Sequence, residues 1–227
     1  MKKYISIILA AALALFFVSC EKQSAGVTKI TYYPVFVLNG DNPLIVPIGT
    51  AFTDPGFTAT LEGVDITSEV TVDSNVDDSA MGVYSVSYSA VNKDGYSYTA
   101  TRTVLVANPG NIDNIYSAFS KMGTRQYDGC TTVITYDTTK DWYVIDDLCG
   151  GYYYYGRYPG YEPTYNFHAK AAFRVNTDNS INVLGALSTW YFYSSFDYTN
   201  VTGTYNPTTG VISYDFDGLA VVLTPIA

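Results

Sequence analysis

The chain has 227 residues, of which 48% are hydrophobic, 16% aromatic and 15% charged, and its formal net charge is −9. This composition is too apolar for a disordered chain, and the acidic balance excludes the basic surface that nucleic-acid binding requires. With one histidine and three cysteines, the sequence also excludes a Cys/His zinc module. We therefore predict a folded protein with no metal site, no cofactor and no nucleic-acid partner.

The first residues have the features of an export signal. Two lysines precede an uncharged apolar run over residues 5–18, which has the length of a signal-peptide core but falls short of the ~20 residues that span a bilayer. Residues 17–20 (FVSC) resemble a bacterial lipobox, which implies that Cys20 becomes an acylated N-terminus. We predict a signal peptide over 1–19 and a tether over 20–27, on a protein held at the membrane by lipid only. The alternative is an ordinary secretory signal in which Cys20 is incidental.

Period-two patterning begins after the tether and predicts β-strands. The even positions of residues 84–90 are Tyr, Val, Tyr and Ala, and the positions between them are serines. A turn with a glycine at residues 92–95 follows, and then a Thr- and Val-rich strand over 96–106. Because Asn, Pro and Gly gather at residues 108–111, we place a boundary there, after a domain over 28–107.

That first domain resembles the bacterial immunoglobulin-like (Ig-like) domains of surface and secreted proteins. The resemblance is carried by residues 49–57 (GTAFTDPGF), 82–90 (GVYSVSYSA), 94–95 (DG) and 100–106 (ATRTVLV). The Asp-Pro-Gly within the first of these has turn chemistry, and the Tyr84 hydroxyl can cap the backbone at a corner, as in other Ig-like sandwiches. The resemblance implies a β-sandwich that acts as a spacer or an interaction module.

The second domain, over residues 111–227, contains both tryptophans and 16 of the 23 tyrosines. Short alternating segments bounded by polar turns predict strands at 131–136, 142–145, 167–175, 181–184, 203–205, 211–216 and 220–223. Roughly eight short antiparallel strands favour a sandwich or a flattened barrel, so we predict an all-β chain throughout. Residues 112–119 fit either a short helix or a first strand, and the all-β context favours the strand.

The whole mature chain is similar to Bacteroidetes lipoproteins of unknown function that join an Ig-like N-terminal domain to a Tyr-rich β domain. Residues 150–152 (GGY), residues 205–212 (YNPTTGVI) and the lipobox carry this likeness. Such proteins often lie near carbohydrate-uptake systems. The resemblance implies a location in the cell envelope, which we expect to be the outer membrane, and a polysaccharide ligand.

Two cysteines remain after lipidation, Cys130 and Cys149, and they flank a predicted hairpin. A turn centred between Thr139 and Lys140 places residue i opposite residue 279 − i, so the two cysteines face each other. Because the envelope oxidises thiols and cross-strand Cβ atoms can lie within bridging distance, we hypothesise a disulfide. The alternative is a pair of buried free thiols.

Seven of the fourteen residues from 152 to 165 are tyrosine. Because glycine and proline interrupt this segment, we expect at least half of it to be a loop, which cannot easily bury so many hydroxyls. Exposed rings stack on the C–H bonds of sugars, so the segment predicts a glycan-binding platform. Its residues are Tyr154, Tyr155, Arg157, Tyr158, Tyr161 and Glu162, joined by Trp190 from a second aromatic stretch. The alternative is that the rings form the core and rim of a Tyr-rich sheet.

Candidate catalytic groups are weak. Asp146 and Asp147 are adjacent and point to opposite faces, and Asp215 and Asp217 fit a solvated strand face better than an acid–base pair. His168 is expected on the outward face of its strand, with no nucleophile motif beside it. We therefore predict a non-enzymatic envelope lipoprotein that binds a glycan. The alternative is a structural or adhesion module that makes protein–protein contacts in a surface complex.

Overall fold

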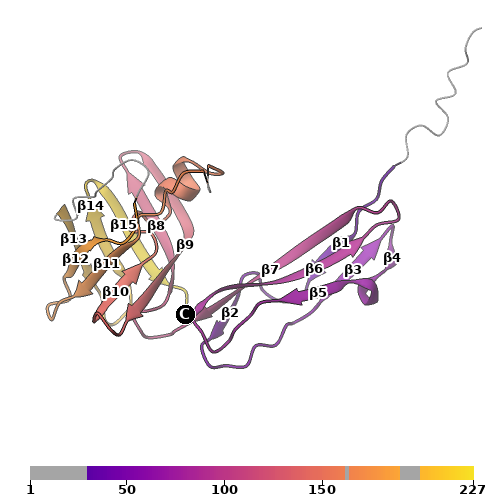
Figure 1. Cartoon of the computed structure of the whole chain (residues 1–227), viewed down its shortest axis with the longest axis horizontal. Helices are drawn as coiled ribbons and strands as arrows, with labels where there is room; N and C mark the ends of the chain where they lie inside the picture. The colour runs from indigo at the N-terminus through magenta and orange to yellow at the C-terminus, as the bar shows by residue number, and fades with distance from the viewer. Residues whose placement is uncertain (1–29, 162–163, 190–199) are drawn as a thin grey trace, which may run out of the picture.

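The computed structural model describes residues 30–161, 164–189 and 200–227, and they form an all-β structure, as predicted (Figure 1). The predictions made for Cys20, Glu162 and Trp190 lie outside the described residues. Two short helices lie wholly within them, the 3₁₀-helix η2 (Thr67–Glu69) and the π-helix η3 (Tyr152–Arg157). Across the described part of the chain, no helix has the length and apolar character needed to cross a membrane.

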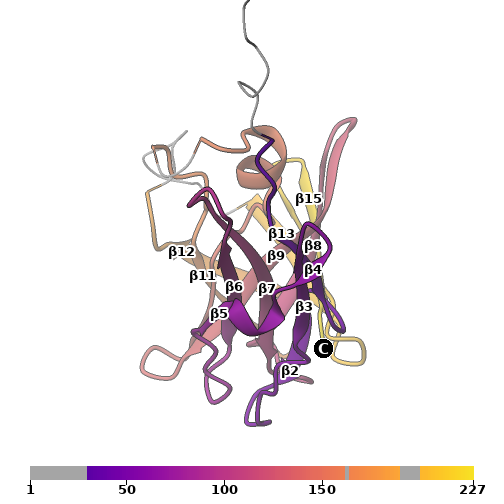
Figure 2. The ribbon, with the colours of Figure 1, turned by 90° about the vertical axis from the view of Figure 1, so that its right-hand side faces the viewer.

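Seven strands form the N-terminal part. They are β1 (Val35–Leu38), β2 (Leu44–Pro47), β3 (Phe57–Leu61), β4 (Val64–Asp65), β5 (Thr71–Ser74), β6 (Gly82–Val91) and β7 (Ser97–Ala107). One sheet has the order β1-β3-β4 and the other the order β2-β7-β6-β5, with β2 parallel to β7 and the remaining pairs antiparallel. Figure 2 shows β3 and β4 on one side and β5, β6 and β7 on the other.

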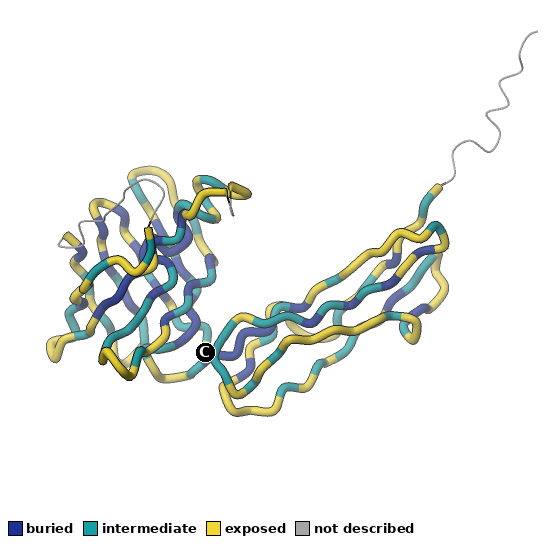
Figure 3. The backbone as a smooth tube through the Cα atoms, in the orientation of Figure 1, coloured by how far each residue is buried: buried dark blue, intermediate teal, exposed yellow. Residues whose placement is uncertain are grey.

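The core of this part lies between the two sheets. Val86 and Tyr88 of β6 are buried there, whereas the serines that alternate with them are half-buried, which is the pattern that the sequence predicts. The ring of Phe57, from the other sheet, lies 4.5 Å from the ring of Tyr88, measured between centroids. Buried positions therefore follow the strands and the turns are exposed (Figure 3), as expected for an Ig-like sandwich.

The predicted tyrosine corner is present where β6 begins. The Tyr84 hydroxyl donates a hydrogen bond to the carbonyl oxygen of Ala80 at 2.9 Å. A Cβ atom added at Gly82 would lie 3.2 Å from the Tyr84 ring. The glycine thus lets the ring fold back over the turn, which explains why Gly and Tyr occur two residues apart here.

A fully buried arginine joins the two sheets. Arg102 of β7 has an exposed fraction of 0%, and its Nε lies 3.3 Å from Asp54 Oδ1. The Tyr88 hydroxyl donates to the same carboxylate at 2.9 Å. The guanidinium also donates to three backbone carbonyl oxygens, those of Asn39, Asp41 and Gly56. The Asp-Pro-Gly turn is therefore held by a buried charge, which the sequence analysis did not anticipate.

Eight strands form the C-terminal part. They are β8 (Ile115–Met122), β9 (Arg125–Asp137), β10 (Trp142–Ile145), β11 (Ala171–Val175), β12 (Ile181–Ala186), β13 (Val201–Tyr205), β14 (Ile212–Phe216) and β15 (Leu219–Pro225). They make one antiparallel sheet in the order β12-β11-β10-β9-β8-β15-β14-β13. The segment that fitted either a helix or a strand is the strand β8.

The two ends of this sheet approach each other, so the sheet is a nearly closed barrel. An antiparallel bridge links Ser180, just before β12, to Thr204 of β13. Beside it, the N–H of Tyr205 donates to the carbonyl oxygen of Asn179 at 2.8 Å. The flattened barrel is therefore the correct one of the two predicted architectures for this part.

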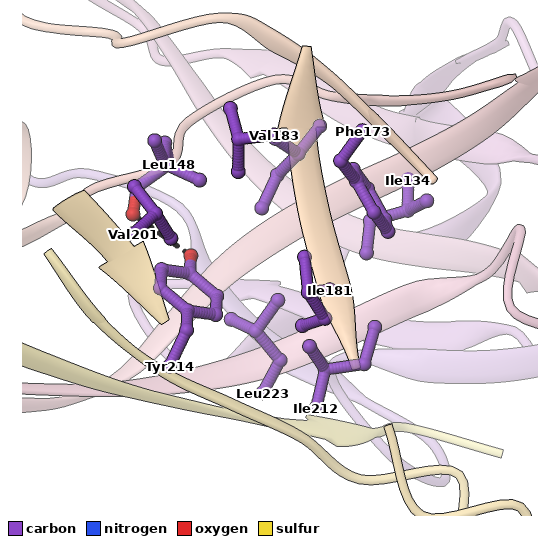
Figure 4. Close-up of a pocket in the computed structure, with 10 residues that line it drawn as sticks. Ile134, Leu148, Phe173, Ile181, Val183, Val201, Ile212, Tyr214 and Leu223 are labelled. Carbon is purple, nitrogen blue, oxygen red and sulfur yellow. Dashed lines mark hydrogen bonds between the residues drawn. The ribbon is translucent and has the colours of Figure 1, made fainter. Parts of the chain in front are cut away.

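Apolar side chains fill the barrel (Figure 4). In the cavity between them, the volume that the centre of a water molecule can occupy is only about 10 Å³. This volume is at the lower limit for holding one water. The Tyr214 hydroxyl is satisfied there by donating to the carbonyl oxygen of Leu148 at 2.8 Å. The lining residues are Ile134, Ile145, Leu148, Phe173, Ile181, Val183, Val201, Ile212, Tyr214 and Leu223. The barrel interior is a packed core, so a ligand site has to be sought on the surface.

Candidate functional site

The first half of the tyrosine-rich segment is helical. Residues Tyr152–Arg157 form the π-helix η3, which stands at one end of the barrel (Figure 1). The N–H of Gly156 bonds to the carbonyl oxygen of Gly151, and that of Tyr158 to the carbonyl oxygen of Tyr153, five residues back in each case. The helix takes six of the fourteen residues, and residues 158–161 have no helix or strand, which agrees with the prediction that at least half of the segment is loop. π-helices are rare and often occur at functional sites.

Two glycines allow η3 to lie directly on the barrel. Gly151 has a φ of 75°, in the left-handed region, and an added Cβ would lie 2.6 Å from the Cβ of Cys130. At Gly156 an added Cβ would lie 2.2 Å from the Tyr127 ring. A larger residue at either position would push the helix off strand β9. This explains the second glycine of the Gly-Gly-Tyr motif, whose tyrosine is the first residue of the helix.

A buried carboxylate fixes the start of the same segment. Asp147 Oδ1 accepts hydrogen bonds from the N–H groups of Cys149 at 2.9 Å and Ala169 at 3.1 Å, and Oδ2 accepts one from Gly151 at 2.8 Å. Burial raises the pKa of Asp147, while these backbone hydrogen bonds act to lower it. Because all three donors are main-chain groups, we assign this carboxylate a structural role.

Part of the tyrosine cluster packs against itself. The Tyr158 ring lies 5.0 Å from the Phe167 ring and 6.4 Å from the Tyr153 ring, with interplanar angles of 16° and 10°. Tyr152, which precedes Tyr153 in the chain, is buried, and its ring contacts the Tyr127 ring edge to face. Tyr158 was predicted to be a ligand contact, but it is half-buried with its ring stacked on other rings. For these residues the structure favours the alternative of an aromatic core and rim.

Three rings of the cluster remain open to solvent. Tyr155, Tyr161 and Tyr165 have exposed fractions of 50%, 54% and 37%. The ring centroids of Tyr161 and Tyr165 each lie within 6.4 Å of that of Phe167. These two rings therefore pack on the stacked rings of Phe167 and Tyr158, which we call the packed aromatic base. Arg157 is exposed, and its guanidinium carbon lies 5.1 Å from the centre of the Tyr158 ring. The rings of Tyr161 and Tyr165 are tilted by 35° against each other, so these two do not form a flat ledge.

Tyr165 was not among the predicted site residues. The signal for it was present, because it closes the run of seven tyrosines. Tyr154 was predicted as a contact, but it is half-buried, with its ring 4.2 Å from His168 and 4.3 Å from Tyr155. His168, expected to point outward, is half-buried as well, with Nδ1 4.0 Å from Asp147 Oδ2. We therefore take Tyr155, Tyr161, Tyr165 and Arg157 as the candidate site.

The cysteines are free. The predicted pairing of β9 with β10, in which residue i lies opposite residue 279 − i, is correct from the pair Asp137–Trp142 to the pair Ile134–Ile145. Strand β10 ends there, and Cys130 pairs with β8 instead. Cys130 and Cys149 are buried free thiols in the structure, so the register from which we predicted the disulfide does not extend to them. Burial raises the pKa of each thiol, which keeps both protonated and unreactive at neutral pH.

The other carboxylate pair belongs to a turn. Asp215 Oδ1 accepts a hydrogen bond from the N–H of Gly218 at 2.9 Å, and Asp217 takes the left-handed φ of 51° inside that turn. Both side chains are exposed. Within the described ranges, no three His, Cys, Asp or Glu side chains come together in a way that suits a metal ion.

Asp146 is the residue whose titration is expected to affect stability. Burial raises its pKa to about 6, although Oδ1 accepts a hydrogen bond from the Val133 N–H. A raised folded-state pKa stabilises the fold at low pH, and this stabilisation is lost as the pH rises from about 4 through about 6. We expect wild type to lose about 1–3 kcal/mol relative to Asp146→Asn between pH 4 and pH 7. Urea unfolding of both proteins at the two pH values measures this difference, and an equal pH dependence would contradict it.

Two family models match the chain. A model described as "Bacterial surface protein, Ig-like domain" matches residues 36–106. A model of a C-terminal domain matches residues 73–225, about two thirds of the chain. The Ig-like resemblance inferred from the sequence is thereby confirmed. No curated protein matches the chain.

Among solved structures, the chain is similar to the lipoprotein BT2262 from Bacteroides thetaiotaomicron. The two are 27% identical, the match covers 84% of this chain and 98% of that one, and the TM-score is 0.56. The predicted likeness to Bacteroidetes lipoproteins is confirmed by this match. Two structures containing CBM51 domains of ZmpB from Clostridium perfringens match at 16% identity with TM-scores of 0.30 and 0.28. They cover 84% and 82% of this chain and 15% and 30% of those chains, and at such scores they add nothing to the assignment.

Proposed function

The chain belongs to the family of the C-terminal domain matched by residues 73–225, and on that premise we propose that it is a non-enzymatic lipoprotein of the bacterial envelope that binds a polysaccharide. In this proposal Cys20 carries the lipid, and the outer membrane is the membrane that holds it. The Ig-like part then places the barrel away from the bilayer, and the exposed tyrosines at η3 bind the glycan.

Two independent observations support the envelope location. Residues 17–20 have the pattern of a lipobox after a signal-peptide core. The chain is also similar over most of its length to a Bacteroides lipoprotein, and its N-terminal part matches a model of bacterial surface proteins.

The exposed rings around η3 are the observation that carries the binding proposal. Tyr161 and Tyr165 pack on the rings of Tyr158 and Phe167, and Tyr155 packs edge to face on Tyr154, so all three exposed rings are held by other rings before any ligand arrives. Ordering these side chains on binding then costs less conformational entropy. Arg157 adds hydrogen-bond donors beside them. Rigid aromatic faces with a nearby donor match the apolar C–H faces and the hydroxyls of a sugar.

The carboxylates near this surface support a binding role over a catalytic one. Asp147 accepts hydrogen bonds from three backbone N–H groups, and Asp146 accepts one from Val133, so both are engaged by the fold itself. Glycoside hydrolysis needs two carboxyl groups that flank the scissile bond. A second candidate function, protein–protein adhesion, becomes the better one if no glycan binds.

The proposal is tested by affinity gel electrophoresis and a glycan array. We expect Tyr161→Ala to weaken binding of any retained polysaccharide by about 5- to 10-fold, which corresponds to at least about 1 kcal/mol. Tyr155→Ala and Tyr165→Ala are expected to act in the same direction. Tyr96→Ala removes an equally exposed ring from the Ig-like part and serves as the matched control.

The outcomes separate the two candidate functions. Glycan binding that survives the triple variant at Tyr155, Tyr161 and Tyr165 would place the glycan site elsewhere. Wild-type protein that binds no glycan on either assay would leave the adhesion role.

A further inference from the structure

The Ig-like part has a second group of exposed rings, at the end where the chain arrives from its N-terminus. Tyr33 lies 6.4 Å from Tyr96 and 6.5 Å from Tyr98, measured between ring centroids. The carbonyl oxygen of Tyr32 accepts a hydrogen bond from Asn92 in the turn between β6 and β7. We call this group the tether-end patch; its exposed members are Ile30, Tyr32, Tyr33, Tyr96 and Tyr98.

The charges beside the tether-end patch are one pair and one further carboxylate, with a net charge of −1 from Glu62, Lys93 and Asp94. Lys93 Nζ lies 2.8 Å from Glu62 Oε2, which makes a surface ion pair. These two residues and Asp94 line a shallow hollow with Ile30 and Tyr32. A surface with little net charge does not depend on anionic lipid for its attraction to a membrane.

The position of the patch identifies what it faces. The described chain begins at Ile30, and in Figure 1 the indigo start of the ribbon lies at the end of the Ig-like part away from the barrel. Ile30 lies ten positions after Cys20 along the chain. Such a segment reaches at most about 35 Å when extended, and roughly 17–19 Å as a flexible coil. If Cys20 carries the lipid, the tether-end patch is held within that distance of the bilayer surface.

We propose that the tether-end patch rests on the membrane, with its tyrosine rings in the headgroup layer. This inference rests on the lipid anchor of the proposed function. Tyrosine prefers the membrane–water interface, because its ring enters the apolar side while its hydroxyl stays hydrated. A single short tether would leave the domain free to tumble, whereas a second contact fixes its long direction away from the surface.

The test uses a tryptophan placed in the patch. The full chain is expressed with its signal peptide, purified from membranes and reconstituted in phosphatidylcholine vesicles with brominated acyl chains. The tryptophan fluorescence of Tyr98→Trp is measured after subtraction of the fluorescence of the parent protein. We expect its emission to shift to shorter wavelength and its intensity to fall because the brominated chains quench it. Val83→Trp is the matched control, because Val83 is 50% exposed against 47% for Tyr98. It lies seven residues along β6 from the partner of Tyr98, or roughly 23 Å.

The intact mass of the same preparation reports whether Cys20 is acylated, so the anchor and the patch are judged separately. Acylated protein whose Tyr98→Trp emission is no more quenched than that of Val83→Trp overturns the patch and keeps the anchor. Protein without acyl groups overturns the anchor and this inference with it. Neither result bears on the glycan site at η3.

Discussion

Replacing Arg102 with methionine is expected to lower the free energy of unfolding of the Ig-like part by about 3–5 kcal/mol. The methionine leaves the Asp54 carboxylate without its cation. It also leaves the backbone carbonyl oxygens of Asn39 and Asp41 without the guanidinium that donates to them, whereas the Gly56 carbonyl oxygen keeps the Asn39 N–H as a donor. Unpaired polar groups in a dry core cost about 1–3 kcal/mol each, and part of this cost is recovered when the turns open to water. Hydrogen exchange of the β6 and β7 peptides in a urea series measures the loss for this part alone.

Two further variants keep this prediction testable if Arg102→Met does not fold. Arg102→Lys retains the charge but not the planar set of donors, so it is expected to fall between wild type and Arg102→Met. Lys93→Met removes an exposed cation whose partner is Glu62, and it is expected to change stability by less than about 1 kcal/mol. If Arg102→Met and Lys93→Met have equal stability, the buried network contributes nothing beyond its packing.

Local patterns in the sequence predict the strands but not this network. Strict alternation places Arg102 on the same face of β7 as Val104, so the sequence holds a hint that a charge points inward. What satisfies that charge comes from turns 46 to 63 residues away along the chain. A periodicity argument cannot place those turns. The hairpin register around Thr139, in contrast, depends only on the turn between neighbouring strands, and it was predicted correctly.

The same limit explains the outcome for the tyrosine segment. Its content of glycine and proline predicts irregular backbone, and the composition predicts that some rings must be exposed. Which rings are exposed depends on Phe167 and Tyr127, which belong to other segments and cover Tyr158 and Tyr152. The disulfide prediction extended the β9–β10 register past Ile145, where Asp147 turns the chain away from β9. Both outcomes depend in part on distant contacts, which are the Tyr127 ring on Tyr152 and the Ala169 N–H that donates to Asp147 from 22 residues away.

Asp147 holds the turn that leads the chain away from β9 after Ile145. Removing its carboxylate is the second of the two changes that we expect to lower stability most. In Asp147→Ala the N–H groups of Cys149, Gly151 and Ala169 lose their acceptor inside the barrel wall. At about 1–3 kcal/mol for each unsatisfied donor, less what water recovers, we expect the barrel to lose about 3–5 kcal/mol. Because Gly151 is the residue just before η3, we also expect glycan binding at Tyr155 and Tyr161 to weaken in protein that is still folded.

A graded pair of variants separates the hydrogen bonds from the charge. Asp147→Asn can keep an oxygen toward Cys149 and Ala169, but it presents an amide N–H₂ to the Gly151 N–H, which removes one acceptor of the pair. We expect its stability to fall between wild type and Asp147→Ala, with amide exchange accelerated at Gly151 before the other two positions. Asp73→Ala, at an exposed carboxylate on β5, is expected to stay within about 0.5 kcal/mol of wild type. Equal amide exchange rates at Gly151 in wild type and Asp147→Asn would show that this carboxylate does not hold the start of η3. In that case the packed aromatic base alone would position the exposed rings.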